Sequence, residues 1–185
     1  ATFVWVDALV RTLRHANLAP IVTRNITDVD DVLTEAARRA GSPYDEFAAI
    51  HQYDFEHDMS ALGVRRPDHE PRAHQHIGDV VRLAQALLDR GAAYEVAGTV
   101  YFRGQSVLRD CGLSESAGLA ALQEFGEDPL DSAKEHPGDV PVWRASRASD
   151  PAWPSPWGQG RPGWHAECSA MVLSTYGASV DIHAG

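Results

Sequence analysis

The chain has 185 residues, of which 44% are apolar and 23% are charged, and its formal net charge is -10 at pH 7. This length allows one well-buried core, or a core with one sizeable insertion, and the composition is ordinary for a globular protein. The acidic balance argues against a surface-wide basic grip on nucleic acid and leaves only localised basic spots, and no apolar run approaches the ~20 residues of a membrane-spanning helix.

The first part of the chain alternates between helical and extended patterns. Apolar residues recur at helical spacing from Thr2 to about Asn17, which predicts an amphipathic helix. The β-branched run from Ile21 to Thr23 predicts a buried parallel strand. Thr27 or Asp28 can cap a following helix that Gly41 ends. This order is typical of a Rossmann-type α/β core.

Two more helices and a hairpin follow. Pro43 begins a long helical segment that runs through Leu62, and a polar, Pro-rich stretch separates it from a helix over roughly His76 to Arg90. Apolar residues alternate between Tyr94 and Phe102 around Ala97-Gly98, which predicts a β-hairpin. The chain after the hairpin has little periodicity until Gly160.

These patterns divide the chain into three parts. We expect residues 1–64 to form the first part of an α/β core, residues 65–159 an insertion, and residues 160–185 the second part of the core. Within the last part, Ser179 to His183 predicts a second core strand, whose carboxyl end lies where open α/β sheets bind ligands. The tryptophans of the insertion predict packing anchors: Trp143, Trp153 and Trp157.

The stretch from Gly160 to Met171, GRPGWHAECSAM, places a cysteine in the first turns of a helix that Gly177 ends. Trp164 and Cys168 are four residues apart, so they lie on one helix face and can line one pocket. A helix amino terminus also stabilises a thiolate. The alternative to a pocket is a purely structural role, in which Cys168 is a small buried hydrophobic residue and Trp164 is a core anchor.

Several motifs in this order resemble the cysteinyl-tRNA synthetase family. GRPGWHAECSAM is similar to its GRPGWHxECSAM motif, and RNITDVDD, from Arg24 to Asp31, looks like a second motif. Further matches are DPL at Asp128 to Leu130, VWRAS at Val142 to Ser146, and DIHAG at Asp181 to Gly185. The resemblance implies a Rossmann-type class I synthetase catalytic core that an inserted connective-peptide region interrupts.

The resemblance also implies a reaction and its partners. In such synthetases the carboxylate of cysteine attacks the α-phosphate of ATP, pyrophosphate leaves, and the cysteinyl group passes to tRNA(Cys). The two cysteines of this chain lie far apart without CxxC spacing, which is typical of a reduced, cytoplasmic protein. We therefore expect a cytoplasmic ATP-dependent ligase without a membrane partner.

Members of the family bind the thiolate of the substrate cysteine to zinc. A serine hydroxyl is a much weaker zinc ligand, so this bond discriminates cysteine from serine. By resemblance Cys168 is one protein ligand, whereas His165 and His183 match no family ligand. The remaining family ligands and the HIGH-like and KMSKS-like ATP motifs have no counterpart in the 185 residues. We expect a partial catalytic core that neither holds zinc tightly nor activates cysteine by itself.

Four residues are implied as substrate contacts by the resemblance. Thr27 looks like the family residue that bonds the cysteine ammonium, and Asn25 and Thr2 look like adenylate contacts. The resemblance also implies that Trp164 forms an apolar wall of the amino-acid pocket. Helix capping by Thr27 and turn formation by Asn25 are the alternatives, and we favour substrate contact with Asp28 as the cap.

Two other functions stay open at this stage. Mycothiol ligase, which joins cysteine to an amino sugar, carries similar motifs, although Arg24, Ser169, Met171 and His183 favour the synthetase. A non-catalytic paralog that keeps the pocket without ATP chemistry is the other alternative.

Overall fold

Helices make up almost all of the regular structure before residue 75, whereas the named strands are confined to residues 93–162. The computed structural model describes residues 2–148 and 150–184. The chain divides into two units, Ala1–His74 and Gln75–Gly185. In the described ranges, no helix is long and apolar enough to cross a membrane.

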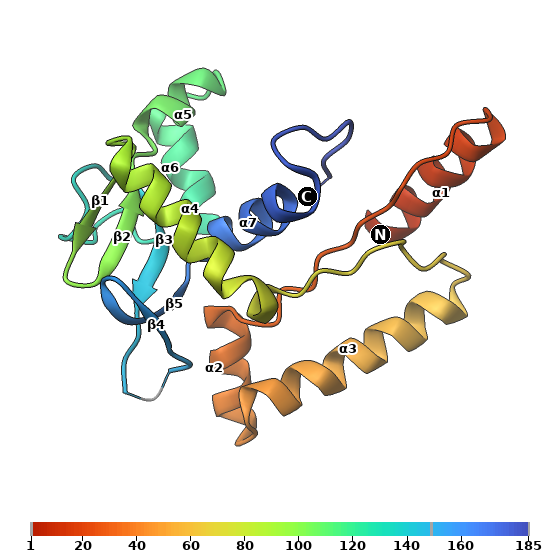
Figure 1. Ribbon diagram of the computed structural model, residues 1–185, viewed down its shortest axis with the longest axis horizontal. Coiled ribbons are helices and arrows are strands. Elements are labelled where there is room, and N and C mark those ends of the chain that lie inside the picture. The colour runs from red at the N-terminus through yellow and green to blue at the C-terminus, as the bar shows by residue number, and fades with distance from the viewer. Residues whose placement is uncertain (1, 149, 185) are drawn as a thin grey trace. The chain divides into compact units, whose positions relative to one another are not determined.

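The first unit contains α1 (Thr2–His15), α2 (Asp31–Ala40) and α3 (Tyr44–Ala61) (Figure 1). All three helices were expected, the first from its apolar spacing and the other two from the residues that begin and end them. Gly41 ends α2 in the left-handed conformation, with φ of 69°, and its N–H bonds the carbonyls of the last turn. The turn that follows brings α3 into contact with α2.

Two details of this unit correct the sequence-based expectations. Asp30 caps α2, because its side chain accepts a hydrogen bond from the N–H of Leu33, so neither Thr27 nor Asp28 is the cap. The run Ile21 to Thr23 forms no strand; Thr23 contributes one isolated parallel bridge, to His69. A β-branched run becomes a strand only where a partner takes its hydrogen bonds along its length, and here the pairing is limited to such single bridges.

The second unit contains a five-stranded antiparallel sheet in the order β1-β2-β3-β5-β4. Its strands are β1 (Ala93–Val96), β2 (Thr99–Phe102), β3 (Val140–Ala145), β4 (Trp153–Ser155) and β5 (Gly158–Pro162). The hairpin β1–β2 was expected, and Ala97 and Gly98 have the positive φ values, 51° and 84°, of a tight hairpin turn. The sequence pattern did not predict β3, β4 or β5.

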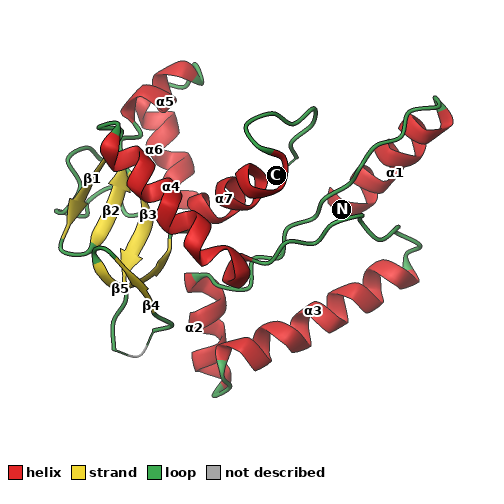
Figure 2. Cartoon of the chain, in the orientation of Figure 1, coloured by secondary structure: helices red, strands yellow, loops and turns green. Residues whose placement is uncertain are grey.

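The two longest helices of the second unit are those that the sequence predicted (Figure 2). A short 3-10 turn, Ala73–His76, leads into α4 (Ile77–Asp89), and α7 spans Trp164–Tyr176. Two short helices, α5 (Gln105–Asp110) and α6 (Glu115–Glu124), lie in the stretch without periodicity.

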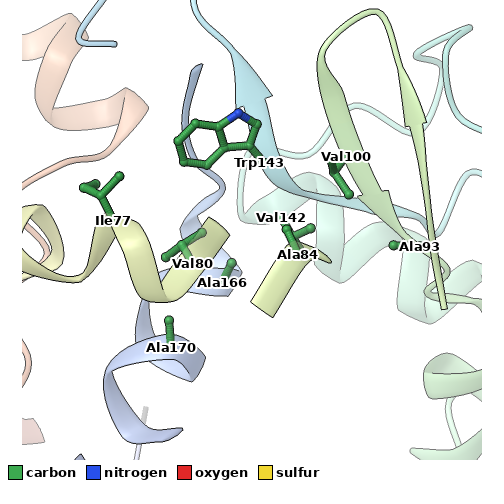
Figure 3. Close-up of a cluster of buried hydrophobic side chains, with 9 residues drawn as sticks. All are labelled: Ile77, Val80, Ala84, Ala93, Val100, Val142, Trp143, Ala166 and Ala170. Atoms are coloured by element: carbon green, nitrogen blue, oxygen red, sulfur yellow. The ribbon is translucent and has the colours of Figure 1, made fainter. Parts of the chain in front are cut away.

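A core of buried side chains joins α4 and α7 to the sheet (Figure 3). Ile77, Val80 and Ala84 come from α4, and Ala166 and Ala170 come from α7. The strands contribute Ala93, Val100, Val142 and Trp143. Trp143 is fully buried, and Trp153 and Trp157 pack against the same cluster, which confirms the expected role of these tryptophans.

The expected second core strand is absent. Ser179 to His183 is irregular, and Val180 and Ile182 are exposed, because none of the described residues pairs with this stretch as a neighbouring strand. The α/β class holds, but the sheet within this chain is antiparallel and not the parallel sheet that the sequence pattern predicted. The division at residues 64 and 159 stays a prediction.

Candidate functional site

A pocket of about 280 Å³ lies in the first unit, between the irregular segment before α2 and the sides of α1 and α3. Its walls combine apolar and polar side chains: Phe3, Arg24, Asn25, Ile26, Thr27, Asp28, Leu33, Ala48, His51, Gln52 and Phe55. This volume and this mixture suit a small polar ligand with an apolar part.

One face of α3 forms a large part of the pocket wall. Ala48, His51, Gln52 and Phe55 follow the helical spacing of three and four residues, so they project from the same side of α3. Phe55 meets Phe3 of α1 edge-to-face, with ring centroids 4.9 Å apart. This contact holds the apolar end of the pocket together.

Asn25 and Thr27, the two residues that the resemblance implies as substrate contacts, lie together in the pocket. The Nδ2 of Asn25 donates a hydrogen bond to the Oγ1 of Thr27 at 3.1 Å. A hydroxyl oxygen has two lone pairs and its own proton, so this bond leaves Thr27 one acceptor position and one donor. Because Asp30 caps α2, Thr27 is released from the capping role.

Arg24 is held against the pocket wall by two partners. Its guanidinium forms an ion pair with Glu70 and lies over the ring of Phe55, 4.8 Å from the centroid. An arginine fixed in this way shapes the pocket wall, and the carboxylate of Glu70 balances its positive charge.

Two neighbouring aspartates have separate tasks. Asp28 is buried and bonds the backbone N–H of His74 at 3.0 Å and the Nδ1 of His74 at 2.5 Å. Asp30 caps α2; burial raises its pKa, while the bond from the N–H of Leu33 acts in the opposite direction. Both aspartates therefore fix the backbone on either side of Val29.

Thr2 does not line this pocket. It is the first residue of α1 and is exposed, one position before the lining residue Phe3. Its implied contact with the adenylate stays a prediction.

Trp164 and Cys168 lie in the second unit, at the start of α7. Gly163 precedes the helix without a side-chain cap, and the two residues occupy one face over its first turns. The indole of Trp164 is 42% exposed, and its ring centroid lies 5.8 Å from that of Phe125. Cys168 is half-buried. The structure thus keeps a large aromatic surface available beside the thiol.

His165 follows Trp164 and is buried on its Nε2 side, where the described residues give that atom no hydrogen-bond partner. Burial lowers the pKa of His165, the charge of Glu127 opposes this shift, and the charge of Arg144 adds to it. Glu127 is itself buried and pairs with Lys134 at 3.4 Å and with Arg144 at 2.8 Å. His165 therefore lies beside a buried ionic cluster, and its burial disfavours the charged form of its ring.

A complete metal site is not present among the residues that the structure describes. In those ranges no three His, Cys, Asp or Glu side chains gather closely enough to hold an ion. Cys168 would supply one ligand, whereas a zinc site closed by substrate needs three protein ligands. The residues present do not by themselves fit zinc, and we derive no chemical step through it.

Of the residues that line the pocket, sequence reasoning named Asn25 and Thr27 as candidate substrate contacts and missed the walls. Phe3, Leu33, His51 and Phe55 were not expected as site residues. The spacing of Ala48, His51, Gln52 and Phe55 was visible in the sequence, but it equally describes an ordinary buried helix face. Only their approach to Asn25 and Thr27 distinguishes the two.

Comparisons with known proteins identify the family of this chain. A family model described as tRNA synthetases class I (C) catalytic domain matches residues 1–185. The cysteine–tRNA ligase of Acidiphilium cryptum is 44% identical over 188 residues, which cover 100% of this chain and 41% of that protein. Those of Geobacter metallireducens and Solidesulfovibrio magneticus are 39% and 42% identical, and each match covers 97% of this chain and 37% of the relative.

The chain thus spans 37% to 41% of the length of these curated relatives. The family match covers both the segment that carries Asn25 and Thr27 and the helix that carries Trp164 and Cys168. This chain belongs to the family of class I (C) tRNA synthetase catalytic domains.

Proposed function

We propose that this chain supplies part of the cysteine-activating site of a cytoplasmic cysteine–tRNA ligase. The hydrogen-bonded pair of Asn25 and Thr27 inside a pocket of about 280 Å³ is the observation that carries the proposal. The matches to relatives named cysteine–tRNA ligase cover nearly the whole chain. This supports tRNA(Cys) as the acceptor, and not the amino sugar that mycothiol ligase uses.

In this proposal Thr27 binds the ammonium group of cysteine. The bond from Asn25 orients the Thr27 hydroxyl and leaves it one lone pair for an N–H of the ammonium. A hydrogen bond to a charged group is worth about 1.5–3 kcal/mol, which is enough to fix one end of a small substrate. The cysteine carboxylate then has a defined direction of attack on the α-phosphate of ATP.

The activation step gains from positioning more than from proton transfer. The carboxylate oxygen forms a bond to the α-phosphorus, and the bond from that phosphorus to the pyrophosphate oxygen breaks. No residue of this chain needs to give or take a proton in that exchange. Binding and orientation by Thr27 and Asn25, and an apolar wall from Trp164, are the contributions that we assign to this chain.

A Thr27→Val substitution tests the assignment, because valine keeps the shape and removes the hydroxyl. We expect the KM for cysteine to rise by about tenfold or more in cysteine-dependent pyrophosphate exchange, measured with a full-length protein that contains this chain. The KM for ATP should change little.

Thr12→Val is a matched control, since Thr12 lies on an exposed face of α1 and its hydroxyl donates a hydrogen bond to the carbonyl of Ala8 in the preceding turn. This control should keep the parental constants. An unchanged cysteine KM in a folded Thr27→Val protein would refute the contact, and a wild-type protein without cysteine-dependent exchange would refute the function.

A further inference from the structure

The pocket segment Val22–Asp28 is held in place by a second segment, Asp68–His74, which we call the brace (Figure 2). The two run side by side with parallel bridges between Thr23 and His69 and between Ile26 and Arg72. Neither segment belongs to a helix or a named strand, apart from the 3-10 turn at the end of the brace. Each therefore relies on the other for its backbone hydrogen bonds.

The backbone bonds alternate along the pair. The N–H of Arg24 donates to the carbonyl of His69 at 3.0 Å, and the N–H of Ile26 donates to that of Pro71 at 2.8 Å. The N–H of Ala73 returns a bond to the carbonyl of Ile26 at 2.9 Å. These bonds fix the two residues that flank Asn25, so the orientation of its side chain follows from the brace.

Side chains fasten both ends of this pairing. At one end the Oδ2 of Asp68 accepts from the N–H of Val22 at 2.8 Å. At the other end Asp28 uses both oxygens, Oδ1 for the N–H of His74 and Oδ2 for its Nδ1, while Arg72 lies 3.6 Å from Oδ2. The side chain of Asp28 is only 9% exposed, and that of His74 is 45% exposed.

A carboxylate so deeply buried needs several donors, and all of those named come from the brace. Asp28 is the residue next to Thr27, and its two bonds to His74 fix the position of the Thr27 backbone. The ammonium contact of Thr27 therefore depends on a contact made outside the pocket.

We propose that Asp28 and His74 are positioning residues for cysteine binding, which hold Thr27 at the distance that the substrate ammonium requires. This inference rests on the proposed function and deepens it. Asp28 acts through the backbone of Thr27, and His74 acts through Asp28.

His74→Ala is the main test, because His74 is half-exposed and its loss removes the Nδ1 bond without opening the core. In a full-length protein that contains this chain, we expect the KM for cysteine to rise about tenfold while the KM for ATP and the kcat at saturating cysteine stay near parental values. His57→Ala, an exposed histidine of α3, is the matched control and should leave all three constants unchanged.

A double-mutant cycle distinguishes positioning from general destabilisation. If His74 acts through Asp28, the protein with both Asp28→Asn and His74→Ala should be no worse for cysteine than the worse single variant. Hydrogen exchange gives a readout that is independent of activity: the amides of Arg24, Ile26 and Ala73 should exchange faster in His74→Ala, and those of α2 should not.

The outcomes separate the two claims. A wild-type protein without cysteine-dependent exchange overturns the proposed function and this inference with it. An active wild type whose His74→Ala variant keeps the parental cysteine KM overturns the inference alone. Additive effects of the two substitutions, or an equal rise in exchange along α2, would also overturn it, because each would indicate independent structural roles.

Discussion

At the scale of single residues, the segment TDVDD shows how far one sequence can be interpreted. From the sequence we favour Asp28 as the helix cap and interpret the three aspartates at positions 28, 30 and 31 as ordinary partners of the helix dipole. The structure assigns the cap to Asp30 and buries Asp28 against His74, 46 residues later. A partner so distant in the chain leaves no local pattern, which is why the sequence analysis placed the cap two residues too early.

The cap at Asp30 leads to a prediction about stability. Asp30→Ala removes the acceptor for the N–H of Leu33, and we expect a loss of about 1 kcal/mol in the free energy of unfolding. Asp30→Asn should lose much less, since asparagine caps equally well and burial disfavours the charged form of Asp30. Urea unfolding of the three proteins measures both effects; equal losses in the two variants would contradict a capping role.

His165 gives a prediction about pH. Burial lowers its pKa below the usual 6.5, so the unfolded chain takes up a proton at a higher pH than the folded chain does. The stability that a neutral His165 contributes is therefore fully present above about pH 6.5 and is lost as the pH falls through the lowered folded pKa.

His165→Gln removes this titration. Between about pH 7.5 and pH 5.5, the free energy of unfolding should fall more steeply in the wild type than in the variant. Urea unfolding followed by tryptophan fluorescence at both pH values measures the difference, and equal pH dependence in the two proteins would show that His165 has no depressed pKa.

At the scale of elements, the helices were predictable and the strands mostly were not. Apolar spacing, Gly41 and Gly177 located α1, α2, α3, α4 and α7 to within a few residues, because helical hydrogen bonds are local. The hairpin β1–β2 was predictable for the same reason. β3 pairs with β2 across the long irregular stretch that contains α5 and α6, and no local pattern specifies such a partner.

The junction of β3 and α7 depends on a glycine. Gly163 has ordinary φ and ψ values, but a Cβ built on it would lie 1.9 Å from the carbonyl oxygen of Pro141. The N–H of Gly163 also bonds the carbonyl of Val142 at 3.0 Å. The close approach of two backbones, and not a special conformation, therefore requires glycine immediately before Trp164.

We expect Gly163→Ala to destabilise the protein by about 1–3 kcal/mol or more, because the alanine methyl group must push β3 and the start of α7 apart. Gly78→Ala is the matched control: Gly78 is exposed in α4, and a Cβ there meets only the Arg82 side chain, at 3.6 Å. The control should be neutral or stabilising by up to about 1 kcal/mol. Thermal unfolding compares the pair, and a neutral Gly163→Ala would refute the steric argument.

At the scale of the whole molecule, the family was predictable from motifs, whereas the arrangement of its parts was not. The resemblance implied substrate contacts for Asn25 and Thr27, which both line the pocket, and the spacing of Trp164 and Cys168 predicted one helix face, which α7 provides; their roles toward substrate stay predictions. The expected parallel strands, Ile21–Thr23 and Ser179–His183, were wrong for this chain. Strand formation depends on neighbours, and the described residues do not supply them.

The ligand inventory yields a prediction for the 185-residue polypeptide. We expect it neither to bind stoichiometric zinc nor to catalyse cysteine-dependent pyrophosphate exchange, because the described residues gather no three-ligand set and the sequence has no HIGH-like or KMSKS-like motif. Metal analysis after dialysis and an exchange assay test this, with a full-length relative as the positive control. Zinc at one equivalent together with robust exchange would contradict it.

The brace also sets an order of events during folding. Asp28 and His74 are 46 residues apart, and α2 and α3 lie between them, so their meeting closes a long loop at an entropic cost. The two helices shorten that loop before it closes, because their own hydrogen bonds are local and form quickly. We therefore expect the pocket segment to become ordered last, as the final closure of a unit whose helices already exist.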